Sequence, residues 1–157
     1  MNEPPVFQAE KQDFCLLQKI EKPISYDYYM SLYRAVGDAF NWTDRLKMDK
    51  SELVEIINKE ETHIFKLIVE NREVGYSELF ITENYVEIQY FGLFTPEIGK
   101  GYGSVFFDLI LKKAWSFNKN KVQLNTCDLD HPKALKMYFC KGFEKTRQET
   151  IIRNITE

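Results

Sequence analysis

Hydrophobic and polar positions follow two periods along this chain, and these periods divide it into expected strands and helices. Apolar runs and alternation of period two predict strands over residues 14–18, 64–69, 74–81, 85–94, 122–127 and from 143 through 152. Apolar positions spaced three and four apart predict helices that begin after two expected N-caps, Ser25 and Ser51. The same spacing predicts a helix over about 103–118 and another from Pro132 to a stop at Gly142.

The connections between these elements indicate how the strands pair. Short turns link the strands at 64–69, 74–81 and 85–94, which predicts an antiparallel meander. A helix separates the strand at 85–94 from that at 122–127, so these two are expected to run parallel. The order predicts a single mixed α/β domain over residues 1–157, with a mostly antiparallel central sheet and flanking helices.

The third strand of the meander has a regular alternation. Val86, Ile88 and Tyr90 alternate with Glu87 and Gln89. Because neighbouring side chains in a strand point to opposite faces, the two sets are expected on opposite sides of the sheet.

Composition narrows the class of protein. The chain is 44% hydrophobic and 15% aromatic, which is ample for a packed core. A net charge of -3 without a basic stripe argues against a nucleic-acid partner. We expect neither a signal peptide nor a membrane span. The three cysteines have no paired spacing, which is typical of reduced thiols in a cytoplasmic protein, and no histidine or cysteine cluster has metal-ligand spacing.

A glycine-rich loop is the strongest candidate for a binding site. An apolar strand runs into a loop with glycine at three alternate positions, Gly99, Gly101 and Gly103, and the loop opens onto an expected helix. Such a loop can turn several backbone N–H groups toward one hollow at a helix N-terminus, where a phosphate or pyrophosphate binds. The alternative is a tight strand-to-helix turn that binds nothing.

The chain resembles the GNAT superfamily of acyl-CoA N-acyltransferases. The loop Gly99-Lys100-Gly101-Tyr102-Gly103 is similar to the family's pyrophosphate motif, and the segment from His131 to Phe143 is similar to its closing motif Asn-x-x-Ala-x-x-x-Tyr-x-x-x-Gly-Phe. The element order extends this resemblance over nearly the whole chain. Two positions depart from the family pattern: Ile98 stands where Arg or Gln is usual, and His131 replaces the usual Asn.

The resemblance implies that acetyl-CoA is the co-substrate and lies where the two parallel strands splay apart. Main-chain groups near Leu93 and Phe94 would pair with the pantetheine amides, and the N–H groups from Ile98 to Ser104 would receive the pyrophosphate. The implied cofactor contacts are Leu93, Phe94, Ile98, Gly99, Lys100, Gly101, Tyr102, Gly103, Ser104, His131 and Lys133.

The resemblance also implies catalytic residues. Tyr138 occupies the position of the tyrosine that protonates the leaving thiolate, although it could be only a core aromatic. Glu87, on the cofactor strand, is the first candidate for the base that deprotonates the amine, with Glu78 second; a solvated strand glutamate is the alternative for Glu87. His131 could serve as a base, orient substrate or simply begin a helix, and Cys127 is interpreted as a packing residue.

Substrate recognition is expected in the first two helices and the loop between them. The residues singled out there and on the neighbouring strand are Tyr33, Trp42, Asp44, Arg45 and Glu78. Arg45 could grip a substrate carboxylate and Asp44 an ammonium group. Alternatively, Trp42 covers the edge of the core and Asp44 pairs with Arg45.

Three functions fit these patterns in decreasing order. The first is an N-acetyltransferase that transfers an acetyl group directly from acetyl-CoA to a primary amine of a small or amino-acid-like molecule, as a monomer or homodimer. The second is a non-catalytic acyl-CoA-binding sensor of the same fold. The third is a nucleotide-binding α/β protein, which the G-x-G-x-G spacing does not favour.

Overall fold

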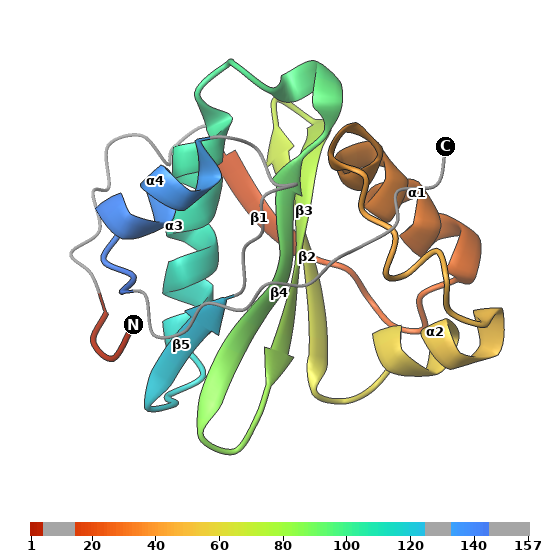
Figure 1. Cartoon of the computed structure of the whole chain (residues 1–157), viewed down its shortest axis with the longest axis horizontal. Coiled ribbons are helices and arrows are strands. Elements are labelled where there is room, and N and C mark those ends of the chain that lie inside the picture. Colours follow the sequence, from red (N-terminus) through yellow and green to blue (C-terminus); the bar gives the residue numbers. More distant parts are fainter. Residues whose placement is uncertain (5–14, 125–132, 145–157) are drawn as a thin grey trace.

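A single twisted sheet separates two layers of helices in the computed structural model, which describes residues 1–4, 15–124 and 133–144. Helices α3 (Tyr102–Trp115) and α4 (Ala134–Cys140) lie on one side of the sheet, and α1 (Tyr26–Gly37) and α2 (Lys50–Ile57) lie on the other (Figure 1). This mixed α/β architecture is the one that the order of periodic segments predicts.

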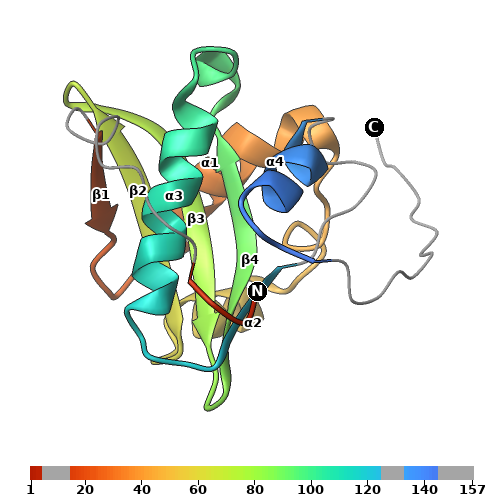
Figure 2. The same ribbon diagram turned by 90° about the vertical axis from the view of Figure 1, so that its left-hand side faces the viewer.

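The five described strands stand in the sheet in their order along the chain. They are β1 (Cys15–Lys19), β2 (Thr62–Val69), β3 (Arg72–Ile81), β4 (Tyr85–Leu93) and β5 (Lys121–Leu124). All neighbours are antiparallel except β4 and β5, which run parallel. The predicted meander and the predicted parallel pair are therefore confirmed. Turned by 90°, the molecule shows α3 crossing the sheet face next to β4 (Figure 2).

The helix starts agree with the sequence in one case and differ in another. Ser25 caps α1, since its hydroxyl accepts a hydrogen bond from the N–H of Tyr28 at 3.2 Å. The prediction that Ser51 caps the second helix is wrong. The extended backbone of Asp49 already turns its carbonyl toward the N–H of Leu53 at 3.0 Å, so α2 begins at Lys50 and contains Ser51.

Each face of the sheet has its own core. On the α3 side the buried residues include Val86, Ile88, Phe106 and Ile110. On the α1 side the fully buried rings of Tyr29, Tyr33 and Tyr76 pack with aliphatic residues of α1, α2 and β2. The aromatic residues of the chain are thus divided between two cores rather than gathered in one.

A β-bulge breaks the alternation expected in β4. Glu78 of β3 pairs with Tyr90, but the next residue, Leu79, pairs with Ile88, so Gln89 is an extra residue in β4. Tyr90 therefore packs against Tyr33 on the α1 side, not beside Ile88 on the α3 side. The expectation that Tyr90 shares a face with Val86 and Ile88 is wrong, because an inserted residue reverses the side-chain direction beyond it.

The C-terminal part is described only in sections. Gly142 follows α4 with φ at 104°, as expected for a residue that ends a helix. Of the expected last strand only Phe143 and Glu144 are described, and neither lies in a strand. Cys127 and His131 fall outside the described residues. None of the described helices is both long enough and apolar enough to cross a membrane.

Candidate active site

The described pairing of the parallel strands β4 and β5 covers the first part of β4. Pairing between β4 and β5 extends from Tyr85 and Lys121 to Ile88 and Leu124, whereas β4 continues to Leu93. Backbone groups on successive residues of a strand point to alternate sides. Since the N–H of Phe94 donates to Val74 of β3 at 2.9 Å, the main-chain groups of Leu93 face the side on which β5 pairs.

The glycine loop joins β4 to α3 through the short 3-10 helix η2 (Thr95–Glu97). Gly99 and Gly101 have φ angles of 90° and 84°, a region that residues with a Cβ atom rarely adopt. A Cβ built on either residue would meet no atom within 4 Å, so conformation and not crowding requires glycine there. Gly103 differs, because it lies within α3 and only Leu93 Cδ1, at 3.8 Å, is near its missing Cβ.

The loop presents unused backbone donors. No backbone carbonyl of the described residues accepts a hydrogen bond from the N–H of Gly99, Lys100 or Gly101. The first N–H groups of α3, from Tyr102 to Ser104, have no intrahelical acceptor because of helix geometry. The N-cap is Gly101, which has no side chain to occupy these donors. A hollow with these properties suits an anionic group such as a diphosphate.

Two of the implied main-chain donors are not available. The N–H of Ile98 donates to the carbonyl of Thr95 at 3.2 Å, and that of Phe94 donates to Val74. The turn that closes η2 uses the N–H of Ile98, whereas the bond of Phe94 joins it to β3. The expectation that the N–H of Ile98 receives the pyrophosphate is therefore wrong, and near Leu93 and Phe94 the N–H of Phe94 is not available to the pantetheine arm.

Charged side chains surround the start of the loop. The buried carboxylate of Glu97 accepts two hydrogen bonds from Arg72, at 2.9 Å to Nε and 3.0 Å to Nη2, and a third from Lys100 at 3.3 Å. These bonds, Arg72 above all, lower the pKa of Glu97. Lys133 lies at the start of α4 with an exposed side chain.

Tyr138 lies in α4 with its ring in the α3-side core. The ring centroid is 5.0 Å from that of Phe107 and 6.4 Å from that of Phe143, and 7% of the residue is exposed. The core position that was the alternative interpretation of Tyr138 is thus observed. Its acid role stays a prediction.

Glu87 lies on the α1 side of β4 and is half-buried. It pairs with Phe80 of β3 and with Gln123 of β5. The amide of Gln89, in the bulge, donates to its carboxylate at 3.4 Å. Glu87 therefore lies one residue before the last described pair of β4 and β5, on the opposite face from Tyr138.

Arg45 and Glu78 form a buried ion pair instead of contacting solvent. Arg45 Nη2 lies 2.7 Å from Glu78 Oε2, and the residues are 5% and 0% exposed. Tyr29 donates to the other carboxylate oxygen at 2.6 Å, and the guanidinium lies 5.1 Å from the ring centroid of Tyr90. Each side chain is buried against the other, and the expected roles of Arg45 as a carboxylate grip and of Glu78 as a substrate ligand or base stay predictions.

The titration of this pair reflects its surroundings. Burial raises the pKa of the Glu78 carboxyl, and the charge of Arg45 and the Tyr29 hydrogen bond oppose that rise. For Arg45 burial disfavours the charged form, but Glu78 outweighs it and the pKa of the guanidinium is raised. Two buried polar atoms, Arg45 Nε and Tyr76 Oη, have no hydrogen-bond partner among the described residues.

The other expected substrate residues surround this pair. Trp42 is half-buried, with ring centroids 5.7 Å from Tyr33 and 5.4 Å from Tyr90. The hydroxyl of Tyr33 accepts a hydrogen bond from the N–H of Arg45 at 3.3 Å. Asp44 is exposed. Tyr33 and Trp42 are thus brought together as an aromatic wall, with Tyr90 as a member that the period-two pattern assigned to the wrong face.

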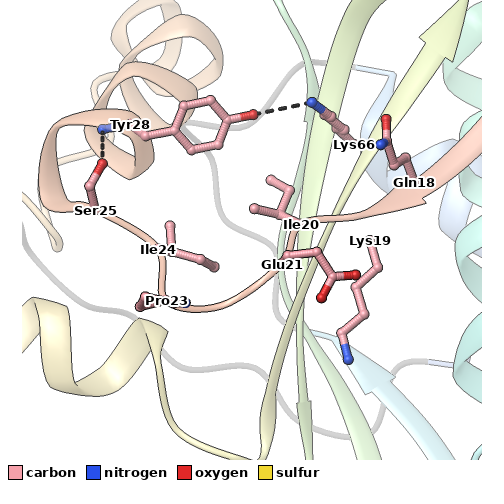
Figure 3. A pocket seen from close by; sticks show the side chains of 9 residues that line it. All are labelled: Gln18, Lys19, Ile20, Glu21, Pro23, Ile24, Ser25, Tyr28 and Lys66. Carbon is pink, nitrogen blue, oxygen red and sulfur yellow. Dashed lines mark hydrogen bonds between the residues drawn. The ribbon is translucent and has the colours of Figure 1, made fainter.

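The described residues also form a shallow pocket elsewhere, at the junction of β1 and α1. Its volume is about 320 Å³, and Lys66 reaches across it to the hydroxyl of Tyr28 at 3.4 Å (Figure 3). The lining contains none of the expected cofactor, catalytic or substrate residues: it consists of Gln18, Lys19, Ile20, Glu21, Pro23, Ile24, Ser25, Tyr28 and Lys66. This pocket is separate from the glycine loop.

Sequence reasoning missed three side chains near the candidate site. Arg72 and Glu97 contact the loop, and Gln89 connects Arg45 to Glu87. The position of Glu97 directly before the loop was a usable signal, but nothing in the sequence indicates that a residue 25 positions earlier pairs with it. Within the described ranges no group of three or more acidic, histidine or cysteine side chains could hold a metal ion.

Comparisons with known proteins address the fold. No family model matches the sequence, and no curated protein sequence matches it. Among solved structures, an aminoglycoside acetyltransferase from an uncultured soil metagenomic sample superposes with a TM-score of 0.67 at 16% identity, over 94% of this chain and 100% of that one. A ribosomal-protein-alanine N-acetyltransferase from Brucella melitensis has a TM-score of 0.64 at 15% identity, over 89% and 99%.

A third structure is named for its family. A GNAT family acetyltransferase from Staphylococcus aureus has a TM-score of 0.60 at 16% identity, over 89% of this chain and 98% of that one. These neighbours share the sheet, the helix layers and nearly the full length, while their low identity limits the likeness to the fold. The chain has the fold of the GNAT acetyltransferases.

Proposed function

We propose that this protein is an N-acetyltransferase that transfers an acetyl group from acetyl-CoA to a primary amine of a small or amino-acid-like molecule. One observation carries the proposal. β4 leads into a loop whose two glycines, Gly99 and Gly101, have positive φ angles and keep backbone donors unused at the start of α3. The GNAT fold supports the same function.

The residues present suit the coenzyme. The N–H groups of the loop and of the first turn of α3 bind the diphosphate, with open space beside Gly99 and Gly101 to admit it. The main-chain groups of Leu93 pair with the pantetheine arm on the side of β4 that faces away from β3. Lys100, half-exposed, adds a positive charge to the same end of the site.

The reaction requires two proton movements. An amine with a pKa near ~10.4 must lose a proton before it attacks, and the thiolate that leaves gains from protonation. We assign the second step to Tyr138, whose ring is held in the core with the α3 residues that also pack on β4. We assign the first to Glu87, acting directly or through water, on the strand that pairs in parallel with β5.

The acceptor side lies over the α1 face of β4. The rings of Tyr33, Trp42 and Tyr90 form a wall there, and Asp44 offers an exposed carboxylate for an ammonium group. The fold neighbours include an aminoglycoside acetyltransferase and a ribosomal-protein-alanine N-acetyltransferase, so this fold accepts chemically different amines. A primary amine is the feature that these acceptors share.

The test combines binding with turnover. Calorimetry with each of CoA, NAD and ATP should show that the protein binds CoA and neither NAD nor ATP. Incubation of the protein with acetyl-CoA and a panel of primary amines should release free thiol and yield acetylated amine, detected by mass spectrometry. Binding of CoA without thiol release on any amine would indicate the non-catalytic sensor. Absence of CoA binding would reject the proposal.

A further inference from the structure

Arg72 stands at a turn that presents it to the glycine loop. The hairpin between β2 and β3 closes at Glu70 and Asn71, with φ angles of 52° and 62°. Turns with two residues of positive φ match the twist of the strands they join. Arg72 pairs with Val69 as the first residue of β3, and the tight turn fixes where its side chain leaves the sheet.

The partner of Arg72 is built into the entrance of the loop. Glu97 is the last residue of η2, and its own N–H donates to the carbonyl of Phe94 at 2.8 Å. Both carboxylate oxygens of Glu97 accept from Arg72, in a two-pronged arrangement that restricts orientation as well as distance. The Glu97 side chain is 9% exposed, whereas that of Arg72 is 43% exposed.

The glycine loop itself has few side-chain contacts to hold it. Cβ atoms at Gly99 and Gly101 would touch nothing, so packing does not determine the path of the backbone there. Lys100, between these glycines, is attached to the same Glu97 carboxylate. Two cations therefore share one carboxylate, and one positive charge at the loop is left uncompensated.

We propose that Arg72, through Glu97, holds the glycine loop in the shape that binds a diphosphate. The same arrangement leaves one uncompensated positive charge at the loop, which the apolar side chain of Ile98 does not supply. This inference rests on the proposed function, since it concerns the same diphosphate site. Arg72 is a positioning residue in this role. The exposed part of its guanidinium makes the alternative, an ordinary surface pair of little consequence, the one to exclude.

Three variants separate position from charge. Arg72→Gln removes the charge and the two-pronged bond, and Arg72→Lys keeps the charge without the paired N–H groups. The double variant Arg72→Glu/Glu97→Arg exchanges the partners and keeps the net charge. Glu73→Gln is the matched control, because Glu73 makes an ion pair with Lys66 on the same two strands, away from the loop. Circular dichroism and thermal unfolding establish that each variant is folded.

The readouts are the Kd for CoA by calorimetry and the separate KM values of the acetyl-transfer assay. Arg72→Gln should raise the Kd for CoA and the KM for acetyl-CoA about tenfold, as expected for a lost charge-assisted pair. Its kcat and its KM for the amine should stay at the wild-type values. Arg72→Lys should bind CoA more tightly than Arg72→Gln but less tightly than the wild type. The double variant Arg72→Glu/Glu97→Arg should bind CoA more tightly than the single variant Arg72→Glu, which is measured beside it. Glu73→Gln should bind CoA as the wild type does.

Opposite results would overturn the inference. They are a wild-type Kd in folded Arg72→Gln, wild-type affinity in Arg72→Lys, or a lower kcat at unchanged KM for acetyl-CoA. These outcomes leave the proposed function intact, because the wild type still binds CoA. If the wild-type protein itself binds no CoA, the proposed function fails and this inference fails with it.

Discussion

Arg45 and Glu78 lie 33 positions apart in the sequence and form a 2.7 Å ion pair that closes the space between the α1–α2 connection and β3. The pair fixes the loop that bears Trp42 and Asp44 to β3. The loop on the proposed acceptor side of the site is thus attached to the sheet through the buried ion pair of Arg45 and Glu78.

Removal of one member of the Arg45–Glu78 pair should lower the free energy of unfolding. Arg45→Met leaves the Glu78 carboxylate buried without its cation, and the free energy of unfolding should fall by about 3–5 kcal/mol. The double variant Arg45→Met/Glu78→Gln removes both charges and keeps an acceptor for Tyr29, so it should lose less. Urea denaturation of both variants checks this; equal losses in the single and double variants would contradict it.

The three loop glycines should respond differently to alanine. Gly99→Ala and Gly101→Ala force a Cβ into the left-handed region and should each cost about 1–2 kcal/mol of local strain, with weaker CoA binding. Gly103→Ala adds a methyl group within α3 at an ordinary contact distance from Leu93. It should keep CoA binding and stabilise the helix by up to about 1 kcal/mol. Calorimetry with CoA and urea unfolding compare the three; a uniform response would mean that backbone conformation is not the reason for glycine.

Gly92 should tolerate no side chain. A Cβ there would lie 2.2 Å from Val36 Cγ1, where α1 packs against β4. Gly92→Ala should therefore lower the free energy of unfolding by about 1–3 kcal/mol through overpacking. Combined with Val36→Ala, which removes the clashing methyl group, it should cost less than the sum of the two single changes. Additive losses in urea unfolding would refute this contact.

Tyr138→Phe tests the acid role without removing a core ring. The phenyl group keeps the packing on Phe107 and Phe143, so stability and the Kd for CoA should change little. Loss of a general acid should lower kcat by about 10²–10⁴-fold. Steady-state thiol release gives kcat. A wild-type kcat in Tyr138→Phe would leave this residue with only its structural role.

Stability should fall in mild acid because of His63. Burial lowers the pKa of this imidazole to about 4, with Lys19, Lys22 and Lys113 contributing, from a usual value of 6.5. The unfolded chain then binds the proton first. The stability contributed by the neutral imidazole is complete above pH 6.5 and is lost as the pH falls from 6.5 toward 4.

Replacement of His63 isolates this effect from other groups. Between pH 7 and pH 5 the free energy of unfolding of the wild type should fall about 1 kcal/mol further than that of His63→Gln, a figure reduced for the partial exposure of the ring. Urea unfolding at the two pH values gives the difference. Parallel pH curves for the two proteins would show that His63 titrates normally in the folded state.

Local pattern determined most of the framework. The hydrophobic periods and turn residues predicted the order of elements, the meander, the parallel pair, the Ser25 cap and the end of α4 at Gly142. These features depend on residues close in sequence, where periodicity and backbone preference act directly. The glycine loop was found in the same way, since its conformation is a local property of Gly99 and Gly101.

Tertiary structure decided what each polar side chain faces. The bulge at Gln89 moved Tyr90 to the other face, the turn at Glu97 engaged the N–H of Ile98, and burial joined Arg45 to Glu78. The sequence identified these residues as chemically capable but could not assign partners. A charge gains or loses its role through its distance to another charge and through the water removed around both, and only the folded chain determines those two quantities.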